Sequence, residues 1–107
     1  MIVEYLRYSV TGADRRAEFE RSYKQAAESL DASPHCLGYE LAHGVEDPEN
    51  YILRIEWDSL EGHEQGFRSS PEFRAFFANI RSFISDIEEM RHYEVTKVRL
   101  EEAAAGR

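Results

Sequence analysis

The chain has 107 residues, which is enough for one compact domain and too few for two. Its 13 Lys and Arg residues against 21 Asp and Glu residues leave a net charge of −8, which argues against nucleic acid and anionic membrane surfaces as partners. A lone cysteine, Cys36, excludes an internal disulfide, and no apolar run approaches the length of a membrane span. Because the first residues lack a signal-peptide pattern, we expect a cytoplasmic protein.

The first thirty residues predict a strand followed by a helix. Residues 2–10 alternate apolar and polar side chains, which is typical of a strand. Apolar residues then recur at helical spacing as far as Asp31, after Thr11 and Asp14, which resemble a capping box. Pro34 ends this helix because proline cannot continue the hydrogen-bond ladder.

The middle of the chain predicts an antiparallel hairpin. Residues 36–45 and residues 51–58 each alternate, and the turn-forming residues 46–50 separate them.

The second half predicts helical segments and a last strand. Asp58 and Glu61 resemble a capping box for a short helical stretch that ends near Phe67. Ser70 and Pro71 then predict the start of a long helix. Its apolar residues form one buried stripe: Phe73, Phe76, Phe77, Ile80, Phe83, Ile84 and Ile87. Residues 89–97 alternate and predict the last strand.

The order strand, helix, strand, strand, helix, strand is the split βαβ arrangement of ferredoxin-like α+β folds, with both helices on one face of an antiparallel sheet. The domain spans residues 1–97, and residues 98–107 form an alanine- and charge-rich tail. Every predicted strand keeps apolar side chains on both faces, so we expect a homodimer whose sheets pack face to face.

Several familiar catalytic motifs are absent. The chain has no glycine-rich phosphate loop, no nucleophile elbow, no paired cysteines and no zinc-binding histidine pair on one helix face. We therefore predict neither a metal nor a cofactor. Aromatic and polar residues near the predicted hydrophobic layer instead suit a flat organic ligand: Tyr5, Arg7, Tyr39, His43, Tyr51, Trp57, His63, Phe67 and His92.

Residues 55–63, with sequence IEWDSLEGH, and residues 66–73, with sequence GFRSSPEF, resemble the antibiotic biosynthesis monooxygenase domain family. The resemblance extends from Met1 to about Thr96 and includes the opening strand, Trp57 at the end of a strand, and the Ser-Pro-x-Phe start of the long helix. It implies a dimeric α+β barrel with a pocket between sheet and helices. Some members of this family oxidise aromatic polyketide or quinol-type substrates without metal or flavin, and others degrade haem.

Haem-degrading relatives carry an asparagine on the first strand and a histidine on the long helix, where this chain has Arg7 and Phe76-Phe77. This difference argues against haem degradation. The chain is also similar to family domains that occur fused to or alongside truncated globins, which implies an oxygen-handling haem protein as a partner.

Three residues are candidates for catalysis. Trp57 could stack on a substrate or donate its indole N–H to a developing oxyanion, or it could be a core residue bonded to a backbone carbonyl. His63 could remove a phenolic proton, although a solvent-facing helix position beside acidic residues is the favoured alternative. Arg7 could hold an anionic oxygen, or it could pair with a strand carboxylate: Glu40, Glu56 or Glu94.

Four further residues are candidate substrate contacts: Tyr5, Tyr51, Phe67 and Phe77. We expect His43 and His92, on edge strands, to lie at the surface or a dimer seam.

The leading hypothesis is a homodimeric, cofactor-independent monooxygenase that acts on a small phenolic, quinol or polyketide-type aromatic molecule. Two alternatives remain open, because a fold does not determine chemistry. One is a non-catalytic ligand-binding or oligomerisation domain, and the other is an isomerase or decarboxylase that uses the same pocket without oxygen. A pocket with convergent polar groups would favour an enzyme.

Overall fold

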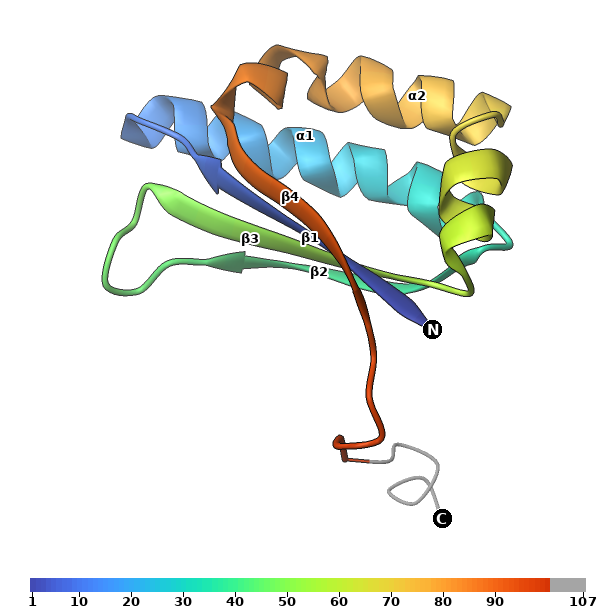
Figure 1. Ribbon diagram of the computed structural model, residues 1–107. Coiled ribbons are helices and arrows are strands. Elements are labelled where there is room, and N and C mark those ends of the chain that lie inside the picture. Colours follow the sequence, from blue (N-terminus) through green and yellow to red (C-terminus); the bar gives the residue numbers. More distant parts are fainter. Residues whose placement is uncertain (101–107) are drawn as a thin grey trace.

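A computed structural model describes residues 1–100 and contains one four-stranded antiparallel sheet with both helices packed on the same face (Figure 1). The strand order β2-β3-β1-β4 confirms the expected ferredoxin-like α+β fold. In chain order the elements are β1 (Ile2–Ser9), α1 (Ala13–Ala32), β2 (Cys36–His43), β3 (Asn50–Trp57), the π-helix η1 (Gly62–Phe67), α2 (Pro71–Ile80), the 3-10 helix η2 (Arg81–Asp86) and β4 (Ile87–Glu94).

Strand β1 is central and determines which side chains face the helices. It pairs antiparallel with β3 on one side and with β4 on the other. Because successive side chains of a strand point to opposite faces, Glu4, Leu6 and Tyr8 face the helices, whereas Tyr5 and Arg7 face away. We call these two sides of the sheet the inner face and the outer face.

The core lies between the inner face and the helices and is rich in aromatic side chains. Phe19 of α1 is fully buried, and its ring centroid lies 4.8 Å from Tyr8, 4.8 Å from Tyr51 and 5.1 Å from Phe83. These tilted and edge-to-face contacts join α1 to β1, β3 and η2. They hold the helices at a fixed place above the sheet.

The second helical region differs from the single long helix that we expected. As predicted, the Ser70 side chain caps the helix, accepting a hydrogen bond from the Phe73 N–H at 3.2 Å. The α-helix ends at Ile80, however, and continues as the tighter 3-10 helix η2, which changes the direction of later side chains. The expectation of one continuous buried stripe is therefore wrong, because Phe77 and Ile84 are 39% and 40% exposed.

The start of α1 also differs from the prediction. The residue before the helix is Gly12 rather than Thr11, and no side chain caps the helix. The φ of Gly12 is +93°, a backbone conformation that favours glycine. Glycine therefore makes the turn out of β1 possible, and the expected capping box at Thr11 is wrong.

The expected tail begins after Lys97, and β4 ends at Glu94. Residues 101–107 of that tail lie outside the described part of the chain. Among residues 1–100, no helix combines the length and the apolar character that crossing a membrane requires.

Candidate functional site

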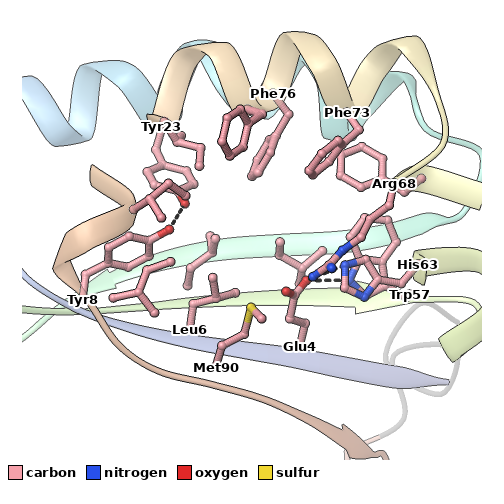
Figure 2. A pocket seen from close by; sticks show the side chains of 17 residues that line it. Glu4, Leu6, Tyr8, Tyr23, Trp57, His63, Arg68, Phe73, Phe76 and Met90 are labelled. Atoms are coloured by element: carbon pink, nitrogen blue, oxygen red, sulfur yellow. Dashed lines mark hydrogen bonds and ion pairs between the residues drawn. The ribbon is translucent and has the colours of Figure 1, made fainter. Parts of the chain in front are cut away.

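A cavity of about 270 Å³ lies between the inner face of the sheet and the second helical region (Figure 2). Its lining is mainly apolar, and four of its lining residues are exposed: Arg68, Phe77, Ile84 and Met90. The strands contribute Glu4, Leu6, Tyr8, Leu53, Ile55, Trp57, Ile87 and Met90, and the helical segments contribute Tyr23, His63, Phe67, Arg68, Phe73, Phe76, Phe77, Ile80 and Ile84. Mainly apolar walls with a few polar groups are typical of small-molecule sites.

A buried carboxylate lies at one end of this cavity. Glu4 is only 4% exposed, and its Oε1 accepts a hydrogen bond from the indole N–H of Trp57 at 3.1 Å. The same oxygen lies 3.3 Å from Nε2 of His63. Figure 2 shows Arg68 extending toward these groups from the helical side. We call Glu4, Trp57, His63 and Arg68 the polar end of the cavity.

His63 connects the polar end to an edge strand. Its ring stacks on Trp57 with centroids 4.6 Å apart, and its Nδ1 lies 2.9 Å from Nε2 of the half-buried His92 on β4. The Nδ1 of His63 thus shares a hydrogen bond with His92, and its Nε2 lies 3.3 Å from Glu4. Both ring nitrogens of His63 face a polar group.

The turn between β3 and η1 holds His63 in place. The hydroxyl of Ser59 accepts a hydrogen bond from the Gly62 N–H at 2.8 Å, and His35 Nδ1 lies 2.9 Å from a carboxylate oxygen of Asp58. The imidazole of His35 packs against Gly66 so closely that a Cβ there would lie 2.4 Å from Nε2. A side chain at position 66 would therefore have to displace the His35 ring from η1.

Burial shifts the proton affinities of the two central groups in opposite directions. Loss of hydration raises the pKa of Glu4, and the Trp57 hydrogen bond and the charges of His92 and Arg68 oppose part of this shift. Burial also lowers the pKa of His63 to about 4, and Arg68 and His92 add to this effect. At neutral pH His63 is therefore uncharged, beside a carboxyl group that holds a proton more strongly than an exposed one.

The opposite end of the cavity carries two tyrosines. Tyr8 of β1 and Tyr23 of α1 are 0% and 5% exposed, and their hydroxyl groups share a hydrogen bond (Figure 2). Burial raises the pKa of Tyr8 to about 12 and also raises the pKa of Tyr23. Both phenols are therefore protonated at neutral pH. We call this pair the hydroxyl end.

The only grouping of metal-ligating side chains found among residues 1–100 is Glu4, His63 and His92, each with one ligand atom within 4.8 Å of the others. Two imidazoles and a carboxylate are a ligand set that several divalent metals accept. A metal bound here would have to replace the hydrogen bond that joins His63 to His92, because Nδ1 of His63 faces His92 and Nε2 faces Glu4.

The structure brings four of the seven sequence-predicted site residues to the cavity and places three elsewhere. Trp57, His63, Phe67 and Phe77 line it. Arg7 and Tyr5 lie on the outer face, where they line a different, shallower hollow with Tyr93. Tyr51 is buried beside the cavity but does not line it, and its hydroxyl donates to a carboxylate oxygen of Glu20.

Three sequence-based interpretations of these residues are corrected. The expectation that His63 faces solvent is wrong, because His63 is only 3% exposed. His92 is not simply a surface residue, because it contacts His63. The Trp57 indole N–H bonds to the Glu4 carboxylate and not to a backbone carbonyl.

The expected ion pair of Arg7 is also not found. Among residues 1–100, no carboxylate lies within ion-pair distance of its guanidinium, including those of Glu40, Glu56 and Glu94. Arg7 is only half-buried on the outer face, so solvent can hydrate its guanidinium.

Sequence reasoning did not select four polar residues that line the cavity: Glu4, Tyr8, Tyr23 and Arg68. For the first two, alternation gave the grouping with Leu6 but not the side of the strand that faces the helices. Glu4 and Tyr8 share the parity of Leu6 on the first strand, so choosing that parity as the inner one would have selected both. Arg68 lies in the segment 66–73 that carries the family resemblance, directly after the selected Phe67, and this was its available signal.

Comparison with known proteins places the chain in a family. The family model described as antibiotic biosynthesis monooxygenase matches residues 1–79. The protein YczJ of Bacillus subtilis is 30% identical over 77 residues, which are 72% of this chain and 81% of that protein.

Solved structures share the fold at lower identity. A candidate antibiotic biosynthesis monooxygenase from Bordetella bronchiseptica has a TM-score of 0.77 at 24% identity and covers 89% of this chain and 96% of that one. SnoaB, a cofactor-independent oxygenase from Streptomyces nogalater, has a TM-score of 0.69 at 17% identity and covers 92% of this chain and 94% of that one. With its fold and more than two thirds of its sequence matched, this chain belongs to the antibiotic biosynthesis monooxygenase family.

Proposed function

We propose that this protein is a cofactor-independent monooxygenase that acts on a small aromatic phenol or quinol. The observation that carries the proposal is Glu4, a buried carboxylate held by Trp57 and His63 at the end of an apolar cavity. Family membership and the likeness to SnoaB support the reaction class. Convergent polar groups inside the cavity favour an enzyme over a domain that only mediates assembly.

Glu4 is the proposed base. A carboxylate with a raised pKa is a stronger base than an exposed one, and the apolar lining suits an aromatic ring beside it. His63 does not take the proton directly in this proposal, because its pKa of about 4 makes it a weak base at neutral pH. It orients Glu4, and a proton received by Glu4 can pass through His63 to His92 if both imidazoles exchange tautomers.

Arg68 and Trp57 have supporting roles in this proposal. Removal of the phenolic proton leaves an electron-rich phenolate, and the guanidinium of Arg68 provides the positive charge nearest this end of the cavity. The indole of Trp57 keeps the Glu4 carboxylate in position through its N–H. Arg7, on the outer face, has no part in these steps.

The overall reaction balances without a further reductant. A quinol and one O₂ give a hydroxyquinone and one water, so one oxygen atom enters the ring and the other leaves as water. The substrate supplies both electrons and both hydrogens of that water. The apolar walls keep bulk water from the reactive phenolate during this step.

The test is oxygen consumption by purified, metal-stripped protein with a panel of anthrones and hydroquinones. Heat-denatured protein corrects for autoxidation, and ¹⁸O₂ identifies the source of the inserted atom. The proposal expects saturable uptake, one labelled oxygen in the product, and loss of uptake in Glu4→Gln. Binding of these compounds without any uptake above the control would favour the ligand-binding alternative. Turnover without oxygen would favour an isomerase or decarboxylase.

A further inference from the structure

The hydroxyl end of the cavity has two O–H groups, but the hydrogen bond between them needs only one donor. Tyr8 and Tyr23 each carry one O–H, and the bond between them uses only one of the two hydrogens. Within residues 1–100, neither phenolic oxygen has another hydrogen-bond partner. Whichever tyrosine donates to the other, one buried O–H donor is left over at the cavity wall.

Among residues 1–100, no acceptor other than the partner hydroxyl lies within hydrogen-bond distance of this donor. The nearest lining side chains along the cavity are apolar, and Glu4 lies at the opposite end (Figure 2). A buried donor without an acceptor costs more free energy than one that is bonded. A ligand oxygen placed at this end would remove that cost.

We propose that the Tyr8–Tyr23 pair is a specificity-determining subsite that donates a hydrogen bond to an oxygen at the far end of the substrate. The two ends of the cavity then recognise two groups of one molecule. An acidic hydroxyl lies beside Glu4, and a carbonyl, ether or hydroxyl oxygen lies beside the tyrosines.

The spacing along β1 indicates the size of this molecule. Glu4 and Tyr8 are four residues apart, so roughly 13 Å of strand separate their backbone positions. The two ends therefore contact different parts of one ligand, and a fused-ring phenol with an oxygen at each end is a suitable probe. A cavity of about 270 Å³ is compatible with such a flat ligand.

A matched pair of ligands tests the subsite without any turnover. The probes 6-methoxy-2-naphthol and 6-ethyl-2-naphthol have nearly the same shape and differ by an oxygen in place of a methylene group at the far end. Their affinities are measured by naphthol fluorescence under anaerobic conditions. We expect the wild-type protein to bind the methoxy compound roughly five-fold more tightly, as one net hydrogen bond predicts.

Variants identify the donor. Tyr8→Phe or Tyr23→Phe alone leaves one hydroxyl whose hydrogen is free, so each single variant should keep part of the preference. The double variant Tyr8→Phe/Tyr23→Phe removes both donors and both acceptors, which is compatible with folding. We expect it to bind both naphthols with equal affinity. Tyr39→Phe, on the exposed strand β2, is the matched control and should keep the full preference.

Three results would overturn this inference: equal affinities in the wild-type protein, an unchanged preference in the double variant, or no binding of either naphthol. The inference uses the proposed function only to orient the hydroxyl toward Glu4. If the protein prefers the methoxy compound but consumes no oxygen, the subsite is supported and the oxygenase proposal is wrong. If it consumes oxygen without this preference, the oxygenase is supported and the subsite proposal is wrong.

Discussion

The two faces of the central strand differ in what their polar side chains do. On the inner face, Glu4 is buried, accepts a hydrogen bond from Trp57, lies 3.3 Å from Nε2 of His63 and has a raised pKa. On the outer face, Tyr5 is 37% exposed and contacts Tyr93 edge to face, and Arg7 has no carboxylate partner among the described residues. Neighbouring residues of one strand therefore lie in different environments. The inner side chains line a cavity because the helices cover that face of the sheet, and the outer side chains do not.

The largest expected effect comes from the inner carboxylate. Glu4→Gln keeps a hydrogen-bond acceptor for Trp57 but removes the base, so we expect kcat for oxygen consumption to fall on the order of 10²- to 10⁴-fold. Glu89→Gln is the matched control, because Glu89 lies on the neighbouring strand β4, faces outward and is exposed. Equal kcat values in the two variants would remove Glu4 from the mechanism.

The second prediction compares the faces through stability. Leu53→Ala removes a side chain that is 2% exposed in the core, and we expect it to lower the free energy of unfolding by about 2–5 kcal/mol. Ile52→Ala, one residue earlier and on the half-buried outer face, should cost less than half as much in dilute solution. Urea unfolding measures both. An equally large loss for Ile52→Ala that grows with protein concentration would instead indicate that this face is buried between two copies.

The third prediction concerns acid. The pKa of His63 is about 4 in the folded chain and near 6.5 when unfolded. Between these values mainly the unfolded chain binds the proton, so falling pH lowers the free energy of unfolding, by up to roughly 3 kcal/mol. The raised pKa of Glu4 acts in the opposite sense, because the folded chain protonates this carboxyl at higher pH than the unfolded chain does.

Urea unfolding at pH 7 and pH 4.5 separates these two contributions. Wild-type protein should lose more stability on acidification than His63→Gln, which lacks the imidazole. His43→Gln controls for a histidine at the edge of the sheet, and it should behave as wild type does. The same pH dependence in wild type and in His63→Gln would contradict the burial of an uncharged His63.

The smallest expected effect distinguishes the two arginines. Arg68→Gln removes the cation at the polar end, and we expect kcat/KM to fall on the order of ten- to a hundredfold. Arg7→Gln, on the outer face, should change kcat/KM less than about twofold, since no contact joins it to the cavity. A larger loss of kcat/KM in Arg7→Gln than in Arg68→Gln would indicate that the substrate binds at the outer face and not in the cavity.

Metal removal tests whether the inner face works through a base or through a metal, because the ligating atoms of Glu4, His63 and His92 lie close together there. Under the proposed mechanism, treatment with a chelator leaves oxygen consumption unchanged. Activity that is lost with the chelator and regained with one divalent metal would assign these three residues to a metal centre. Inductively coupled plasma analysis of the purified protein then gives the metal content per chain.

Local patterns were sufficient for the order and type of the elements. Alternation predicted all four strands, and the capping serine and the following proline predicted where α2 begins. The patterns were not sufficient for the end of that helix. The α-helix changes to a 3-10 helix after Ile80, and Phe77 and Ile84 are more exposed than helical periodicity implied.

The amino-acid sequence by itself determined the fold class and part of the site. Trp57, His63 and Phe67 were recognisable as candidates because they lie in segments that resemble one family, and Phe77 was a candidate on the apolar stripe of the next helix. All four line the cavity. Only the tertiary structure decided that Glu4 rather than Arg7 faces the ligand space, and that His92 reaches His63. The physical reason is that a strand with apolar side chains on both faces has no inner side until the helices pack on it.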